Sequence, residues 1–340
     1  MLYTAKLNHP ERNPDLLRLL SDFELTLPEG ADEGLGLYED EALVGCGFLK
    51  GNMLQGLAVD RDRQGEGLSA TLVTALIQLA AGRGIRHLNV ITKPSMAGML
   101  AGLGLRRVAD APPYAAFLEF GSPGAPEYAA GLRALAAGKP EDRACLVMNC
   151  NPFTRGHRYL VERASWENGW VFVLAVQEDL STFPFRDRLR LMEEGLRDLP
   201  NVTVASGGEY CVSSLTFPSY FTREERLAAA QAAMDAELFC QLVAPALGVK
   251  RRYVGTEPVS RVTAVYNRTL HERLPRRGIQ VVELERLPAA DGRAVSASSV
   301  RAALRAGDWE AVRELVPDVT WTYLRSPEAA PALERLGRED

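Results

Sequence analysis

The feature that most constrains the fold is an uninterrupted apolar run at residues 170–176 (WVFVLAV). A strand with one face in water alternates apolar and polar residues, whereas a strand covered on both faces is apolar throughout. The run therefore predicts an interior strand of a parallel sheet. Further strand-like runs lie at 144–148, 202–204, 252–254 and 279–284, and helical stretches at 186–198, 223–245 and 260–272. This alternation predicts a doubly wound parallel sheet, which binds ligands at the carboxyl ends of its strands.

The stretch 151–157 (NPFTRGH) directly follows the first of these strands and opens a helix. A turn between a strand and a helix start directs free backbone N–H groups and the positive end of the helix dipole at whatever lies above it. Such a turn is an anion site. The candidate site residues in this stretch are Asn151, Pro152, Phe153, Thr154, Gly156 and His157.

A second stretch, 295–301 (VSASSVR), has the same character. Its hydroxyl side chains precede another helix, and Arg301 falls one turn into that helix. A guanidinium fork matches the oxygens of a phosphate group. The candidate phosphate-binding residues here are Ser296, Ser298, Ser299 and Arg301.

The two stretches resemble the T/H-x-G-H and I-S-x-S-x-x-R signatures of the nucleotidyltransferase superfamily, whose members attack the α-phosphate of a nucleoside triphosphate. Val295 stands where isoleucine is usual. The resemblance implies that His157 and Thr154 donate to phosphoryl oxygens, while Arg301 binds the leaving pyrophosphate. Two ordinary capped helices are the alternative interpretation.

Residues 1–125 carry a different pattern, with paired strands expected at 44–49 and 53–59. The following loop, 64–69 (QGEGLS), resembles the Q/R-x-x-G-x-G/A loop of the GCN5-related N-acetyltransferase (GNAT) fold. Glycines in such a loop let backbone N–H groups approach the diphosphate of coenzyme A. Gln64, Gly65 and Gly67 are therefore candidate binding residues, although a tight turn before an amphipathic helix would look similar.

The chain of 340 residues is long enough for two domains. We predict a GNAT-like mixed α/β domain at 1–125, a linker at 126–140 and a Rossmann-like nucleotidyltransferase domain at 141–330. A net charge of −5 argues against non-specific nucleic-acid binding. We expect no membrane span and no signal peptide. Five cysteines without a C-x-x-C pair indicate reduced thiols in a cytoplasmic protein.

The whole layout resembles the citrate (pro-3S)-lyase ligase family, in which an acetyltransferase-like domain precedes a nucleotidyltransferase domain. Besides the two motifs, the resemblance is carried by 183–186 (FPFR), 198–202 (DLPNV), 216–221 (TFPSYF), 254–258 (VGTEP) and 262–267 (VTAVYN). Within these stretches, Gly255 and Glu257 are candidate nucleotide-binding residues. The arginines at 186, 188 and 190 form either one solvated helix face or, at Arg186, a phosphate contact.

The resemblance implies an ATP-dependent acetylation of a thiol. Acetate would attack the α-phosphate of ATP and release pyrophosphate, which leaves acetyl-adenylate. The thiol of a CoA-like prosthetic group on the acyl carrier subunit of citrate lyase would then take the acetyl group and release AMP. Mg²⁺ would be bound mainly by phosphate and water oxygens, so we predict no protein metal ligand.

Two other functions fit the sequence. A nucleotidyltransferase could join a nucleoside monophosphate to a small phosphorylated acceptor, with the first domain regulatory. An acetyl-CoA-dependent acetyltransferase or sensor could instead use the first domain, with the second as a degenerate binding module. The complete pair of motifs in the second domain argues against that last interpretation.

Overall fold

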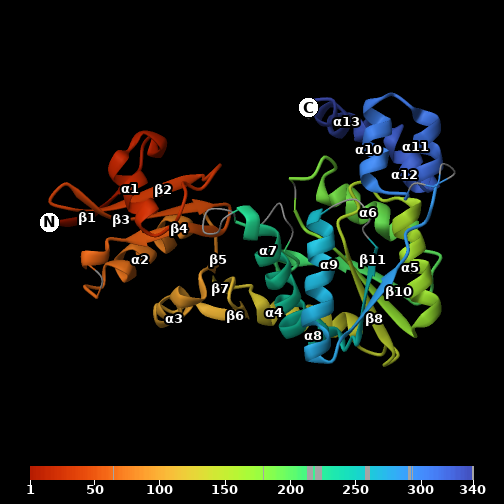
Figure 1. Ribbon diagram of the computed structural model, residues 1–340, viewed down its shortest axis with the longest axis horizontal. Helices are drawn as coiled ribbons and strands as arrows, with labels where there is room; N and C mark the ends of the chain where they lie inside the picture. Colours follow the sequence, from red (N-terminus) through yellow and green to blue (C-terminus); the bar gives the residue numbers. More distant parts are fainter. Residues whose placement is uncertain are drawn as a thin grey trace. The chain divides into compact units, whose positions relative to one another are not determined.

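The computed structural model describes residues 1–63, 65–178, 180–212, 217–218, 224–256, 261–289, 292 and 294–338 (Figure 1). They group into two compact units. The first unit combines Met1–Tyr128 with Phe217–Glu237, and the second combines Ala129–Thr216 with Leu238–Asp340.

A mixed sheet of seven strands forms the first unit, in the order β1-β2-β3-β4-β5-β7-β6. Neighbouring strands are antiparallel except for β4 and β5, which are parallel. The strands are β1 (Leu2–Lys6), β2 (Glu33–Glu39), β3 (Ala42–Lys50), β4 (Met53–Val59), β5 (His87–Thr92), β6 (Arg106–Ala111) and β7 (Ala115–Gly121).

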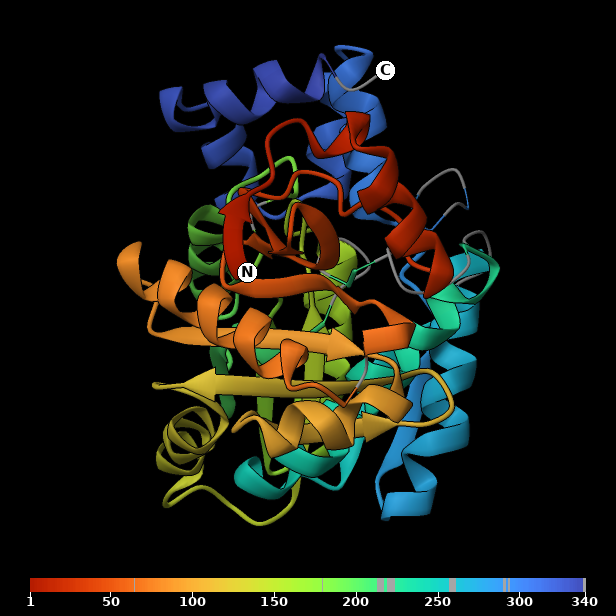
Figure 2. The same cartoon turned by 90° about the vertical axis from the view of Figure 1, so that its left-hand side faces the viewer.

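Helices cover both faces of this sheet. Alternate residues of β3 point to opposite faces, and apolar side chains on each face pack against a helix. Cys46 and Phe48 share a buried cluster with α1 (Pro14–Asp22). Leu49 belongs to the cluster beneath α2 (Leu68–Gly82), which Figure 2 shows across the near face of the sheet. Helix α3 (Pro94–Gly102) follows β5 in the chain.

The parallel pairing of β4 with β5 covers only two residue pairs, Met53 with Asn89 and Leu54 with Val90. Beyond these pairs β4 continues to Val59, and no described strand pairs with it on that side. The paired strands expected at 44–49 and 53–59 are confirmed as β3 and β4. A pocket lies beside the end of β4, where Leu57, Ala58 and Val59 line it together with residues of α2 and α3.

A parallel sheet of five strands forms the second unit, in the order β10-β9-β8-β11-β12. The strands are β8 (Arg143–Met148), β9 (Trp170–Ala175), β10 (Val202–Ser206), β11 (Arg251–Gly255) and β12 (Gln280–Leu284). The predicted interior strand is confirmed, because β9 lies between β8 and β10 and five of its six residues are buried. The order reverses between β8 and β11, which makes this point the switch point of a doubly wound sheet.

Helices α5 (Arg155–Glu167) and α6 (Phe185–Gly195) connect the strands on one side of the switch point, and α9 (Arg261–Arg273) connects β11 to β12 on the other. Right-handed crossovers put these two groups on opposite faces of the sheet (Figure 1). The further helices are α4 (Ala125–Ala136), α7 (Glu224–Leu238), α8 (Ala244–Leu247), α10 (Ala297–Arg305), α11 (Trp309–Leu315), α12 (Asp318–Leu324) and α13 (Ala330–Leu336). No helix in the described part of the chain is both long and apolar enough to cross a bilayer.

Candidate functional site

The candidate site begins where β8 ends, at the switch point of the second sheet. Thr154 is the N-cap of α5, and its hydroxyl accepts a hydrogen bond from the N–H of His157 at 3.2 Å. A reciprocal hydrogen bond runs from the N–H of Thr154 to Nδ1 of the His157 imidazole, at 3.0 Å. The two residues thus close a capping box, which fixes both the helix start and the ring.

This hydrogen bonding also assigns the tautomer of His157. A ring nitrogen that accepts from a backbone N–H carries no proton, so the proton of the neutral ring sits on Nε2. The Thr154 hydroxyl lies 2.9 Å from the same Nδ1 and can donate to it. His157 therefore presents an N–H donor from Nε2.

The imidazole is uncharged at neutral pH. Burial lowers the pKa of His157 to about 4, and the positive charge of Arg286 acts in the same direction. The donor at Nε2 is therefore a neutral one.

The second motif forms the start of α10. Ser296 is its N-cap, and its hydroxyl accepts from the N–H of Ser299 at 3.0 Å. The hydroxyls of these two serines lie 2.8 Å apart. Ser298 lies in the first turn, where its hydroxyl accepts from Arg301 Nη2 at 3.3 Å. A second helix N-terminus and a guanidinium therefore lie side by side.

The structure brings the two motifs into direct contact, although about 140 residues separate them. A Cβ on Gly156 would lie 2.5 Å from the carbonyl oxygen of Val295, so only glycine permits this approach. Arg301 Nη1 donates to the carbonyl oxygen of Asn151 at 2.6 Å. The two helix starts therefore meet at one corner of the sheet, where helix N-termini and a guanidinium can bind an anion.

The remaining residues of the first motif shape the loop. The side-chain oxygen of Asn151 accepts from the N–H of Phe183 at 3.0 Å. Pro152 and Phe153 are buried. The Phe153 ring stacks against the His157 ring with centroids 6.1 Å apart, and its carbonyl accepts from the Thr320 hydroxyl at 2.9 Å.

Arg188 corrects one expectation, because it is fully buried rather than part of a solvated helix face. Its guanidinium donates to the carbonyl oxygens of Asn149 at 2.7 Å and Phe183 at 3.0 Å, which ties the end of β8 to the loop before α6. The sequence holds a signal for this: on a helix, Arg188 shares a face with Phe185 and Met192. Arg186, by contrast, is 89% exposed.

Gly255 ends β11, on the far side of the switch point from β9. Its carbonyl accepts from the side-chain amide of Asn267 at 2.9 Å. Two predicted site residues, Gln64 and Glu257, lie outside the described residues. Among the described residues, no group of three His, Cys, Asp or Glu side chains is placed to hold a metal ion.

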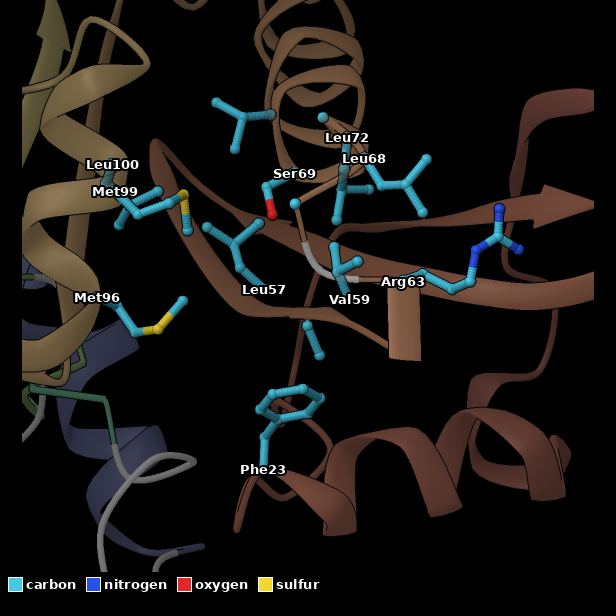
Figure 3. A pocket seen from close by; sticks show the side chains of 14 residues that line it. Phe23, Leu57, Val59, Arg63, Leu68, Ser69, Leu72, Met96, Met99 and Leu100 are labelled. Carbon is cyan, nitrogen blue, oxygen red and sulfur yellow. The ribbon is translucent and has the colours of Figure 1, made fainter. Parts of the chain in front are cut away.

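The predicted CoA-type loop lies in the first unit, beside a pocket of about 280 Å³ (Figure 3). Gly65 and Gly67 have φ angles of +93° and +79°, and a Cβ on either would meet nothing within 4 Å. Gly67 caps α2 without a side-chain hydrogen bond. The pocket is lined mainly by apolar side chains from β4, α2 and α3, among them Leu57, Val59, Leu72, Met96 and Met99.

Comparisons with known proteins agree with this architecture. The sequence model described as citrate lyase ligase C-terminal domain matches residues 143–324, and that of the acetyltransferase (GNAT) family matches residues 4–100. A citrate (pro-3S)-lyase ligase from Escherichia coli (strain K12) is 35% identical over 95% of this chain and 93% of its own. The chain belongs to the citrate lyase ligase family.

A second relative, the citrate (pro-3S)-lyase ligase of Klebsiella pneumoniae, is 38% identical over 90% of this chain and 91% of its own. Among solved structures, an N-acetyltransferase from Staphylococcus aureus Mu50 is similar to 36% of this chain and 98% of its own, with 12% identity and a TM-score of 0.30. The family and the fold expected from the sequence are confirmed. As a member of the citrate lyase ligase family, the protein is an enzyme.

The contact between Gly156 and Val295 gives a stability prediction. Gly156→Ala forces a methyl group against a backbone carbonyl, so we expect the free energy of unfolding to fall by about 2 kcal/mol. Urea denaturation measures this change. Gly131→Ala in α4 is the matched control, because a Cβ there meets nothing within 4 Å and alanine favours a helix. Equal stability of the Gly156→Ala variant and the unchanged protein would contradict the close approach.

Proposed function

We propose that this chain activates acetate with MgATP and transfers the acetyl group to a thiol of the acyl carrier subunit of citrate lyase. A carboxylate oxygen of acetate forms a bond to the α-phosphorus as the bond to the pyrophosphate oxygen breaks. The thiolate then bonds to the acetyl carbon of acetyl-adenylate, and AMP leaves. The contact between the two motif helices is the observation that carries this proposal, since it concentrates anion-binding groups at one corner.

The first step needs no general base. Carboxylic acids have a pKa of about 4, so acetate is already an anion at neutral pH. What the step requires is positioning and stabilisation of the charge on the phosphoryl oxygens. The neutral Nε2–H of His157 supplies a fixed donor of this kind, with Thr154 holding the ring.

The pyrophosphate is the second anion to be stabilised. Arg301 and the start of α10 suit it, because a guanidinium and free N–H groups both bind phosphate oxygens. Mg²⁺ enters as part of the substrate MgATP, held by phosphate oxygens and water.

The five cysteines are all free, which supports a reducing, cytoplasmic location.

The pocket of the first unit fits the acceptor. A CoA-like arm is a chain of apolar and amide groups that ends in a thiol and carries a diphosphate at its other end. The largely apolar pocket suits the chain, and the open Gly65–Gly67 turn before α2 suits the diphosphate. The first domain would thus hold the arm of the carrier subunit.

Exchange of labelled pyrophosphate into ATP tests the first step. With purified protein and Mg²⁺, we expect exchange that depends on added acetate, because only a reversibly formed acetyl-adenylate returns the label. Exchange that ignores acetate would replace this proposal with direct nucleotidyl transfer.

In the same assay, His157→Ala should slow acetate-dependent exchange by roughly 10²–10³-fold, as expected for the loss of a charge-stabilising donor. His271→Ala is the matched control, since His271 is a surface histidine that pairs with Glu283. It should exchange within about twofold of the unchanged protein. Near-normal exchange by a folded His157→Ala variant would exclude the assigned role.

The arm-binding proposal has its own test. Gly65→Asp and Gly67→Asp place a carboxylate where the diphosphate would lie, so the KM for the carrier subunit should rise at least about tenfold, while the KM for ATP stays constant. Gly51→Asp is the matched control, because Gly51 also has a positive φ (+56°) and open space around it but lies in the turn between β3 and β4. An unchanged KM for the carrier in both loop variants would show that the arm binds elsewhere.

A further inference from the structure

Arg286 lies two residues beyond the end of β12, at the same edge of the second sheet as the two motifs. Strands β11 and β12 are parallel, with Leu284 opposite Gly255. The N–H of Thr256 donates to the carbonyl oxygen of Leu284 at 2.8 Å. Arg286 Nε donates to the carbonyl oxygen of Thr256 at 2.6 Å. These bonds fix the arginine at the carboxyl ends of the two strands.

The stem of Arg286 runs beside α5. A Cβ on Gly255 would lie 3.2 Å from Leu160 Cδ1 and 3.6 Å from Arg286 Cγ, so the two side chains flank the same strand end. Leu160 is one turn after His157 on α5. The first turn of α5 and the stem of Arg286 are therefore neighbours.

The segment that contains Arg286 also contacts the second motif. The carbonyl oxygen of Leu287 accepts from the N–H of Val295 at 2.9 Å. Val295 is the residue whose own carbonyl approaches Gly156. The position of residues 286 and 287 is thus tied to both helix starts of the site.

We propose that Arg286 is a phosphate-binding residue of the nucleotide site and contacts phosphoryl oxygens of MgATP from the β12 side. This inference rests on the proposed function only for the identity of the nucleotide. Arg301 is held on the β8 side by the Asn151 carbonyl, so the two guanidiniums come from opposite sides of the switch point. A triphosphate requires several cations around it, and half-buried guanidinium forks bind its oxygens in pairs.

The electrostatics of the site agree with this placement. The positive charge of Arg286 contributes to the lowered pKa of His157, which means that the charge acts at the imidazole that faces the α-phosphate in the proposed reaction. Arg286 therefore acts on the same region as the His157 donor.

Equilibrium dialysis measures the binding of α,β-methylene-ATP, in the presence of Mg²⁺, to the full chain. This experiment tests the inference without requiring turnover. Arg286→Met keeps the length of the stem but removes the charge and the donors. We expect its Kd to rise roughly 10- to 100-fold, the loss typical of a hydrogen bond to a charged group. Arg286→Lys keeps the charge without the fork and should recover part of the affinity. Arg305→Met is the matched control, because Arg305 also donates to one carbonyl, that of Leu336, but at the other end of α10.

The outcomes separate the inference from the proposed function. An unchanged Kd in Arg286→Met, or an equal loss in Arg305→Met, would overturn the role of Arg286. In the exchange assay, a raised KM for acetate with an unchanged KM for ATP would also overturn it. If the unchanged protein shows no acetate-dependent exchange but Arg286→Met still loses nucleotide affinity, the proposed function fails and the inference about Arg286 stands.

Discussion

The contact between Gly156 and the carbonyl of Val295 is the constraint on which the rest of the site depends. It joins the start of α5, the helix that follows β8, to the start of α10, which lies about 140 residues later in the chain. Because both helices point their N-termini at the same corner, the partial positive charges of the two ends add. Arg301, bonded across to Asn151, strengthens the same junction. Without this junction each helix start would be a weak anion site of a kind found in many proteins.

Arg188 holds together the loops beneath this corner. Its buried guanidinium donates to carbonyl oxygens just after β8, just after β9 and just before α6. Such a charge is costly to bury unless hydrogen bonds compensate it. The carboxyl edge of the sheet is therefore fixed by a polar network, while the strands below it are held by apolar packing.

Local patterns in the sequence were enough to predict both folds. The apolar run at 170–176 predicted the buried strand, and the glycine loop before α2 predicted the first domain. The two motifs could also be recognised, because each combines a strand end with a helix start. Their contact could not be predicted in detail, since it depends on a glycine and a carbonyl far apart in the chain.

Arg188 and Arg286 were hidden for different physical reasons. Arginines are normally exposed to solvent, so the charge of Arg188 predicted exposure. Its position on the apolar face of the helix, which indicated burial, was the weaker signal. Arg286 belongs to no motif, and only the parallel register of β11 and β12 brings it to the site.

The uncharged state of His157 has a consequence for the release of products. A permanent cation in the role proposed for His157 would also form a charge-assisted hydrogen bond with the phosphate of AMP, which would slow the release of AMP. In the proposed reaction, a neutral N–H donor still binds more strongly as charge builds up on the phosphoryl oxygens, but it holds the phosphate of AMP less tightly than an imidazolium would. If His157 has the proposed role, the capping box that keeps Nδ1 unprotonated therefore favours ready departure of AMP after each acetyl transfer.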